Sequence, residues 1–130
     1  MEINRIDHVV LTVRDIAATC SFYTRVLGMR EERFGAGRTA LHFGRQKLNL
    51  QQAGQESTLV ARLPTPGSGD LCFITTTPLD AVLTHLRDCG VAVEAGPVAR
   101  EGATGRMDSV YFRDPDGNLV EVSNYREPPA

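Results

Sequence analysis

The chain has 130 residues, of which 42% are hydrophobic and 23% are charged. These proportions are typical of a globular protein and exclude an intrinsically disordered one, and the length suits a single domain over residues 1–130. The formal net charge of −2 supplies no basic surface for nucleic acid or for an anionic membrane, so a small molecule is the expected partner.

The first predicted elements are a strand followed by a helix. Residues 8–13 form an apolar, β-branched run, and Asp15 can cap a helix over about 15–27 that stops at Gly28. Apolar residues recur at helical spacing along one face of this helix: Ile16, Cys20, Tyr23 and Leu27.

The same order of signals returns further along the chain. Residues 70–76 form a second β-rich run, Thr77 is placed to cap a helix with Pro78 in its first turn, and Gly90 ends that helix. The predicted caps, Asp15 and Thr77, differ by 62 positions, and so do the stops, Gly28 and Gly90. A constant offset across two elements indicates an internal repeat.

Each copy then continues into a predicted β-hairpin. Residues 41–51 align with residues 111–121 at an offset of 70, and the turn of the second hairpin is Asp114-Pro115-Asp116-Gly117. The extra length of the second copy falls in the Gly-rich segment 96–106, which we expect to be a flexible lid or substrate loop. The boundaries that follow are module one at about 5–53, a linker at about 54–69 and module two at about 70–125.

The cysteines and the N-terminal residues indicate a compartment. Cys20, Cys72 and Cys89 form no C-x-x-C pattern and fit reduced thiols better than disulfides or a zinc site. The first residues lack the apolar segment of a signal peptide, and no run of 18 apolar residues occurs. We therefore expect a cytoplasmic protein with no membrane span.

The repeat selects four candidate metal ligands. His8 and Asp70 open the first strand of each copy, whereas Gln51 and Glu121 lie on the last strand of each copy. A pseudo-twofold arrangement would let an imidazole, two carboxylates and an amide oxygen converge on one divalent ion. Such a set is compatible with Zn, Ni, Mn, Co or Fe(II).

Simpler roles compete with ligation. Asp70 can cap a turn, and a single His on a strand is more often structural than a ligand. Glu121 carries the strongest signal, because a carboxylate among Leu119, Val120 and Val122 requires a partner if it is buried. His42 aligns with Phe112, so an aromatic packing role is predicted for it.

Three segments carry a family resemblance. Residues 6–13, 22–29 and 114–121 resemble the signatures of the vicinal oxygen chelate superfamily, which comprises glyoxalases, bleomycin-resistance proteins and extradiol dioxygenases. Residues 64–68 and 96–98 resemble the branch that contains a virulence-associated, lactoylglutathione-lyase-like protein. The resemblance implies an α+β fold of tandem βαβββ modules that form a cupped eight-stranded mixed sheet, and it implies a homodimer.

The resemblance also implies a metal site and an activity. It gives ligand roles to His8, Gln51, Asp70 and Glu121, although the family usually has His or Glu at the place of Asp70. The expected function is that of a metal-dependent lyase or isomerase, in which Glu121 removes a proton to form an enediolate. Candidate substrates include a glutathione adduct, and Arg100 or Arg106 would hold an anionic end. An Fe(II) extradiol dioxygenase, which needs a second imidazole, and a metal-free drug-binding protein are the alternatives.

Overall fold

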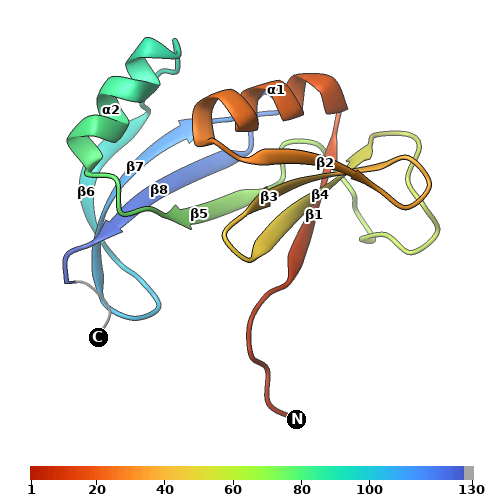
Figure 1. Ribbon diagram of the computed structural model, residues 1–130, viewed down its shortest axis with the longest axis horizontal. Coiled ribbons are helices and arrows are strands. Elements are labelled where there is room, and N and C mark those ends of the chain that lie inside the picture. The colour runs from red at the N-terminus through yellow and green to blue at the C-terminus, as the bar shows by residue number, and fades with distance from the viewer. Residues whose placement is uncertain (128–130) are drawn as a thin grey trace. The chain divides into compact units, whose positions relative to one another are not determined.

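The computed structural model describes residues 1–127 and divides into two compact units, Met1–Ser68 and a second unit that begins at Gly69. Each unit contains one helix and four strands (Figure 1). In chain order the elements are β1 (His8–Val13), α1 (Ile16–Leu27), β2 (Arg30–Phe34), β3 (Arg38–Phe43), β4 (Gln46–Gln52), β5 (Asp70–Ile74), α2 (Leu79–Asp88), β6 (Ala95–Glu101), β7 (Arg106–Arg113) and β8 (Leu119–Tyr125). Neither helix is long and apolar enough to cross a membrane, within residues 1–127.

The two units repeat one topology. The strand order is β1-β4-β3-β2 in the first sheet and β5-β8-β7-β6 in the second. The first and last strands of each unit are parallel, and the other neighbours are antiparallel. Eight strands in two mixed sheets, with one helix in each unit, confirm the predicted α+β class with tandem βαβββ modules.

Helix α1 starts and stops where the sequence predicts. The Asp15 side chain accepts a hydrogen bond of 3.1 Å from the Ala18 amide, and Gly28 adopts the left-handed conformation with φ of 67°. One face of the helix packs on the first sheet and buries a core that includes Tyr23, Val26, Val13, Leu41 and Leu48. Burying apolar surface of this kind is the main stabilising contribution to the unit.

Helix α2 begins differently from the prediction. Thr77 makes no side-chain capping bond, and the Leu79 amide instead donates to Oδ1 of Asn124 on β8 at 3.0 Å. The Asn124 amide nitrogen donates to the carbonyl oxygens of Thr75 and Thr77. The prediction of Thr77 as the N-cap is therefore wrong, because a side chain distant in the sequence satisfies the first helical amide.

In the first unit, a side chain from the last strand likewise binds the backbone at the start of α1. Gln52, on β4, accepts from the Ile16 amide through Oε1 at 3.4 Å and donates through Nε2 to the Arg14 carbonyl. Gln52 and Asn124 are thus equivalent residues, and they differ by 72 positions.

Strand pairing gives the same offset of 72 and corrects the predicted hairpin alignment. Val10 pairs with Asn49 in the first unit, and Cys72 pairs with Glu121 in the second. Because Val10 and Cys72 are equivalent at the offset of 62, the counterpart of Glu121 is Asn49 and not Gln51. The error arises in the turns, which span residues 44–45 in one copy and 114–118 in the other.

The segment 96–106 is largely a strand and not a flexible loop. Residues 95–101 form β6, which pairs along β7, and only 102–105 connect the two strands. This tip is closed by a 2.7 Å bond from the Gly102 amide to the Gly105 carbonyl. The Thr104 amide also donates to the Tyr125 hydroxyl at 3.2 Å. The extra residues of module two therefore lengthen a hairpin, and the prediction of a lid is wrong.

Candidate functional site

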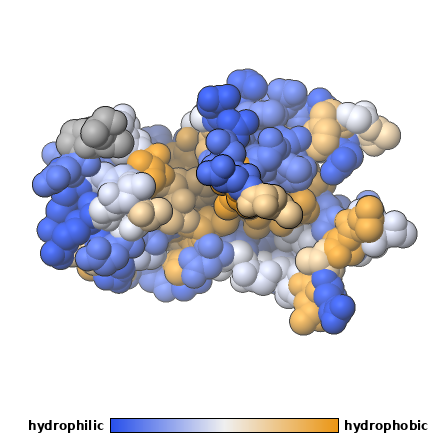
Figure 2. Space-filling model, turned by 90° about the horizontal axis from the view of Figure 1, so that it is seen from below, coloured by the Kyte–Doolittle hydropathy of each residue, from blue (hydrophilic) through white to orange (hydrophobic). Residues whose placement is uncertain are grey.

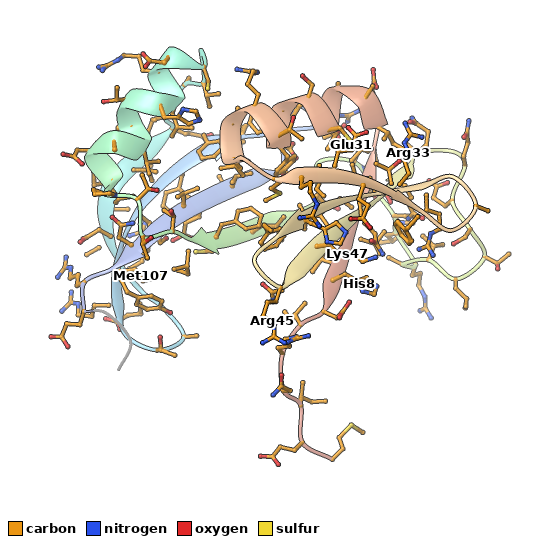
Figure 3. The ribbon with its side chains drawn as sticks, in the orientation of Figure 1. His8, Glu31, Arg33, Arg45, Lys47 and Met107 are labelled. Atoms are coloured by element: carbon orange, nitrogen blue, oxygen red, sulfur yellow. The ribbon has the colours of Figure 1, made fainter. Side chains whose placement is uncertain are left out.

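Each sheet has a face covered by its helix and an opposite face, which we call the open face. Strand residues alternate between these faces, so the pairs His8–Lys47, Val10–Asn49 and Thr12–Gln51 share the open face of the first sheet. Figure 3 shows His8 and Lys47 on this side of the strands, whereas Glu31 and Arg33 on β2 lie toward α1. The polar residues of interest therefore project away from the core.

His8 is exposed at the start of β1, and the preceding residue, Asp7, orients its imidazole ring. Its Nδ1 lies 2.9 Å from Oδ1 of Asp7. The hydrogen bond with His8 is the largest of the effects that hold the pKa of Asp7 below its usual value. A carboxylate on Nδ1 leaves Nε2 available to coordinate an ion, an arrangement that is common for metal-binding histidines.

Gln51 does not lie beside His8. The register places Gln51 opposite Thr12, four residues along β1 from His8, which corresponds to about 13 Å. The Gln51 Nε2 donates to the Thr12 hydroxyl at 2.9 Å. The structure thus places these two predicted ligands on one face but at opposite ends of the strand pair.

Asn49 is a candidate that the sequence analysis missed. It is only 4% exposed, and its Oδ1 has no hydrogen-bond partner among residues 1–127. A buried carbonyl oxygen without a donor is costly, so this atom fits a cation or a donor group of a ligand. The signal was present in the sequence, because Asn49 stands between Leu48 and Leu50 as Glu121 stands between Val120 and Val122.

In the second unit, a polar row crosses the open face of the sheet. Tyr111 on β7, Glu121 on β8 and Cys72 on β5 are successive cross-strand neighbours. Arg100 on β6 extends the row, because its Nε donates to the Tyr111 hydroxyl at 2.8 Å. Burial raises the pKa of Tyr111, and the hydrogen bond from Arg100 opposes that shift.

Glu121 is the centre of this row. The side chain is part-buried, and Oε2 accepts a 3.3 Å hydrogen bond from the Ser123 hydroxyl. Asp70 is exposed on the same face and pairs with Leu119, two positions along β8 from Glu121. The open face explains how a carboxylate is tolerated in an otherwise apolar strand, since Val120 and Val122 point to the opposite face.

Two other predicted residues lie elsewhere. Arg106 is exposed and lies on β7, five residues from Tyr111. Its Nε lies 3.8 Å from Oε1 of Glu101. His42 lies on the open face of the first sheet, with Nε2 3.6 Å from Oε2 of Glu32. The predicted packing role of His42 is wrong, because Leu41 and not His42 occupies the buried place of Phe112.

The predicted ligands are divided between the units. His8 and Gln51 belong to the first unit, and Asp70 and Glu121 belong to the second. Within either unit, no three His, Cys, Asp or Glu side chains of residues 1–127 gather as a metal site. The donor types in each unit are nevertheless ones that divalent ions bind: the first unit has the His8 imidazole and the buried Asn49 amide oxygen, and the second has the part-buried Glu121 and the exposed Asp70 carboxylates.

Comparison with known proteins decides the family. The model of the Glyoxalase/Bleomycin resistance protein/Dioxygenase superfamily matches residues 5–122. The chain belongs to this superfamily. Members of the superfamily typically bind a divalent metal and small molecules, and many form dimers.

Several relatives match this chain over nearly its whole length. It is 53% identical to Virulence protein STM3117 of Salmonella typhimurium, over 96% of this chain and 87% of the relative. An integron cassette protein from Vibrio cholerae matches with a TM-score of 0.94 and 55% identity, over 96% of this chain and 98% of that one. A lactoylglutathione lyase from Agrobacterium tumefaciens matches with a TM-score of 0.73 and 29% identity, over 95% and 96% of the two chains.

Proposed function

We propose that this protein is a metal-dependent lyase or isomerase of glyoxalase type that acts on a small anionic substrate with two neighbouring oxygens. The observation that carries the proposal is the row Arg100–Tyr111–Glu121 on the open face of the second sheet. A carboxylate beside a hydroxyl that is bonded to a cation can accept a proton and hold an anionic substrate in one place. The likeness to a lactoylglutathione lyase supports the same reaction class.

The ligands proposed for the ion are His8, Asp70, Glu121 and one amide oxygen. For the amide we prefer Asn49 to Gln51, because Asn49 takes the place equivalent to Glu121 in the strand register and its buried Oδ1 accepts no hydrogen bond among residues 1–127. A bound divalent ion would polarise the substrate oxygens and stabilise negative charge that develops on them.

The remaining roles belong to side chains of the second unit. Glu121 removes the proton next to the polarised carbonyl group. The Tyr111 oxygen accepts from Arg100, and the Tyr111 hydroxyl also interacts with the Glu121 carboxylate, so Tyr111 links the cation to the proposed base. The exposed part of the Arg100 guanidinium binds the anionic end of the substrate, which makes Arg100 a better candidate for this role than Arg106.

The dioxygenase alternative is less well supported. It requires two imidazoles on one Fe(II) ion, and the only other His on the open face of the first sheet, within residues 1–127, is His42. Lys47 is the cross-strand neighbour of both His8 and His42, so the two histidines stand two strands apart, about 10 Å between their backbones. A metal-free binding protein would have no need for the Asp7–His8 pair or for Glu121.

We also propose that the protein is a homodimer. The open faces carry apolar residues as well as polar ones, and Val10 and Ile74 are 47% and 52% exposed. Figure 2 shows hydrophobic surface among hydrophilic side chains. Light scattering coupled to gel filtration is expected to give twice the chain mass of 14.2 kDa, and a single chain mass would contradict the proposal.

Metal content and activity together test the function. The wild-type protein, His8→Ala and Glu121→Gln are purified and analysed for bound metal, with His85→Ala on α2 as a matched control. Each is then assayed with the methylglyoxal–glutathione adduct and with a catechol. We expect His8→Ala to lose metal and Glu121→Gln to lose turnover, whereas His85→Ala keeps both. Ring cleavage of the catechol with bound iron would favour the dioxygenase, and a wild-type protein that binds no metal would contradict both enzymes.

A further inference from the structure

Two fully buried serines lie behind Glu121. Ser109 on β7 and Ser123 on β8 are both 0% exposed and are cross-strand partners. Their Oγ atoms are 2.6 Å apart. The neighbouring residues Val110 and Val122 turn toward the helix side, so the two hydroxyls occupy the open-face side of an otherwise apolar strand pair.

Three groups contact the Ser123 hydroxyl oxygen. Besides Ser109 Oγ, they are Glu121 Oε2 at 3.3 Å and Cys72 Sγ at 3.4 Å. A hydroxyl has one hydrogen to donate and two lone pairs to accept with. An ionised carboxylate can only accept, so Ser123 donates to Glu121, and its oxygen is then free to accept from the Ser109 hydroxyl and from the Cys72 thiol. This assignment uses the one hydrogen and both lone pairs of the Ser123 hydroxyl.

The hydrogen bond from Ser123 restricts the conformations of the Glu121 side chain. Residues 121 and 123 lie on the same face of β8, so the hydroxyl reaches the carboxylate along the strand. A free Glu side chain loses rotamer entropy when it is fixed on a ligand, and this loss weakens binding. A hydrogen bond from a buried donor incurs part of that cost during folding, before the ligand binds.

We propose that Ser123, backed by Ser109, is a positioning residue that holds the Glu121 carboxylate in the orientation in which it binds the metal ion. This inference rests on the proposed function, because it assigns a partner to the same carboxylate. The competing role is purely structural, in which the serine pair only satisfies its own hydrogen bonds.

Co²⁺ titration followed by visible absorption separates these roles. Removing a residue that orients a metal ligand weakens metal binding by about 10- to 100-fold, so Ser123→Ala is expected to weaken Co²⁺ binding by about tenfold. Ser123→Thr keeps the hydroxyl and is expected to restore binding. Ser57→Ala, which removes an exposed hydroxyl of the first unit, serves as the matched control and is expected to bind Co²⁺ as the wild type does.

Stability is measured in parallel because Ser123→Ala leaves the buried Ser109 hydroxyl without its partner. The double variant Ser109→Ala/Ser123→Ala removes both hydroxyls and is expected to fold better while still binding Co²⁺ weakly. Unchanged Co²⁺ affinity in a folded Ser123→Ala or double variant overturns the positioning role.

A double-mutant cycle keeps the inference separate from the proposed function. The stabilities of Glu121→Ala, Ser123→Ala and the combined variant are measured in urea with a chelator present. If the hydroxyl holds the carboxylate, the two effects are non-additive without any metal. A wild-type chain that binds no Co²⁺ would overturn the metal-dependent function, and additive effects in the cycle would overturn the positioning of Glu121.

Discussion

Replacing Gly96 by Ala tests the close approach of β6 to β7 behind the serine pair. Gly96 has a φ of 104°, in the region that favours glycine. A Cβ at this position would meet the Ser109 carbonyl oxygen and would lie 2.9 Å from the Val110 Cα. Both contacts are with backbone, so neither can be relieved by a side-chain rotation.

Two terms contribute to the expected loss of stability. A positive φ costs a non-glycine residue about 1–2 kcal/mol, and overpacking costs about 1–3 kcal/mol. We therefore expect Gly96→Ala to lower the free energy of unfolding by about 2–5 kcal/mol. Gly90 is the matched control, because it also has a positive φ of 74° but has no atom within 4 Å of an added Cβ. Gly90→Ala is expected to lose only the backbone term, about 1–2 kcal/mol.

Urea unfolding followed by circular dichroism measures both variants. The slope of the free energy against urea should stay unchanged, so that the shift in midpoint reports stability alone. The reasoning is refuted if the two variants are equally stable within about 0.5 kcal/mol, because the steric term would then be absent.

Three further predictions concern the helix start, the thiols and pH. Asn124→Ala removes three hydrogen bonds at the start of α2 and is expected to cost about 1–3 kcal/mol in urea unfolding, and Asn124→Asp, which keeps the acceptor for Leu79 but sets a carboxylate oxygen against the Thr75 and Thr77 carbonyl oxygens, should not restore this loss. Burial raises the pKa of Cys20 to about 11 and also raises the pKa of Cys72, but the Cys20 side chain is buried whereas Cys72 is exposed. Iodoacetamide at neutral pH should therefore modify Cys72 well before Cys20; mass spectrometry of the digested protein gives the order, and the reverse order would contradict the burial of Cys20. His8 lowers the pKa of Asp7 from 3.8, so the stabilising pair is present above that pH and is lost as the pH falls below it. The difference in urea midpoint between the wild type and Asp7→Asn should accordingly be small near neutral pH and vanish in acid, and a difference that grows in acid would show the sign to be wrong.

The strand–helix half of each module could be predicted because its signals are local. Asp15 and Gly28 bracket α1 as expected, since a side-chain cap and a left-handed glycine are read from neighbouring residues. The predicted cap of α2 was wrong, by contrast, because the capping side chain, Asn124, comes from the far end of the module. A partner so distant in the sequence leaves no local signal near Thr77.

The repeat alignment behind the candidate ligands placed Gln51 and Glu121 on equivalent faces but in the wrong register. The predicted offset of 70 differs from the offset of 72 in the structure by two residues, and a strand has a side-chain period of two. An error of two positions keeps a side chain on the same face, which is why Gln51 still lies on the open face while Asn49 takes the place equivalent to Glu121. The hydrophobic pattern determines which face a side chain occupies, whereas the turn length determines its position along the strand. A two-residue turn and a five-residue turn share no sequence pattern from which the two copies could be aligned.

Strand β8 carries two separate functions within a few residues of each other. Glu121 belongs to the candidate site, and Asn124 fastens the first turn of α2. A displacement of this strand would therefore move the Glu121 carboxylate and release the start of the helix together. Ligands that fix Glu121 are thereby expected to tighten the start of α2, which connects occupancy of the site to the order of a helix on the opposite face of the sheet.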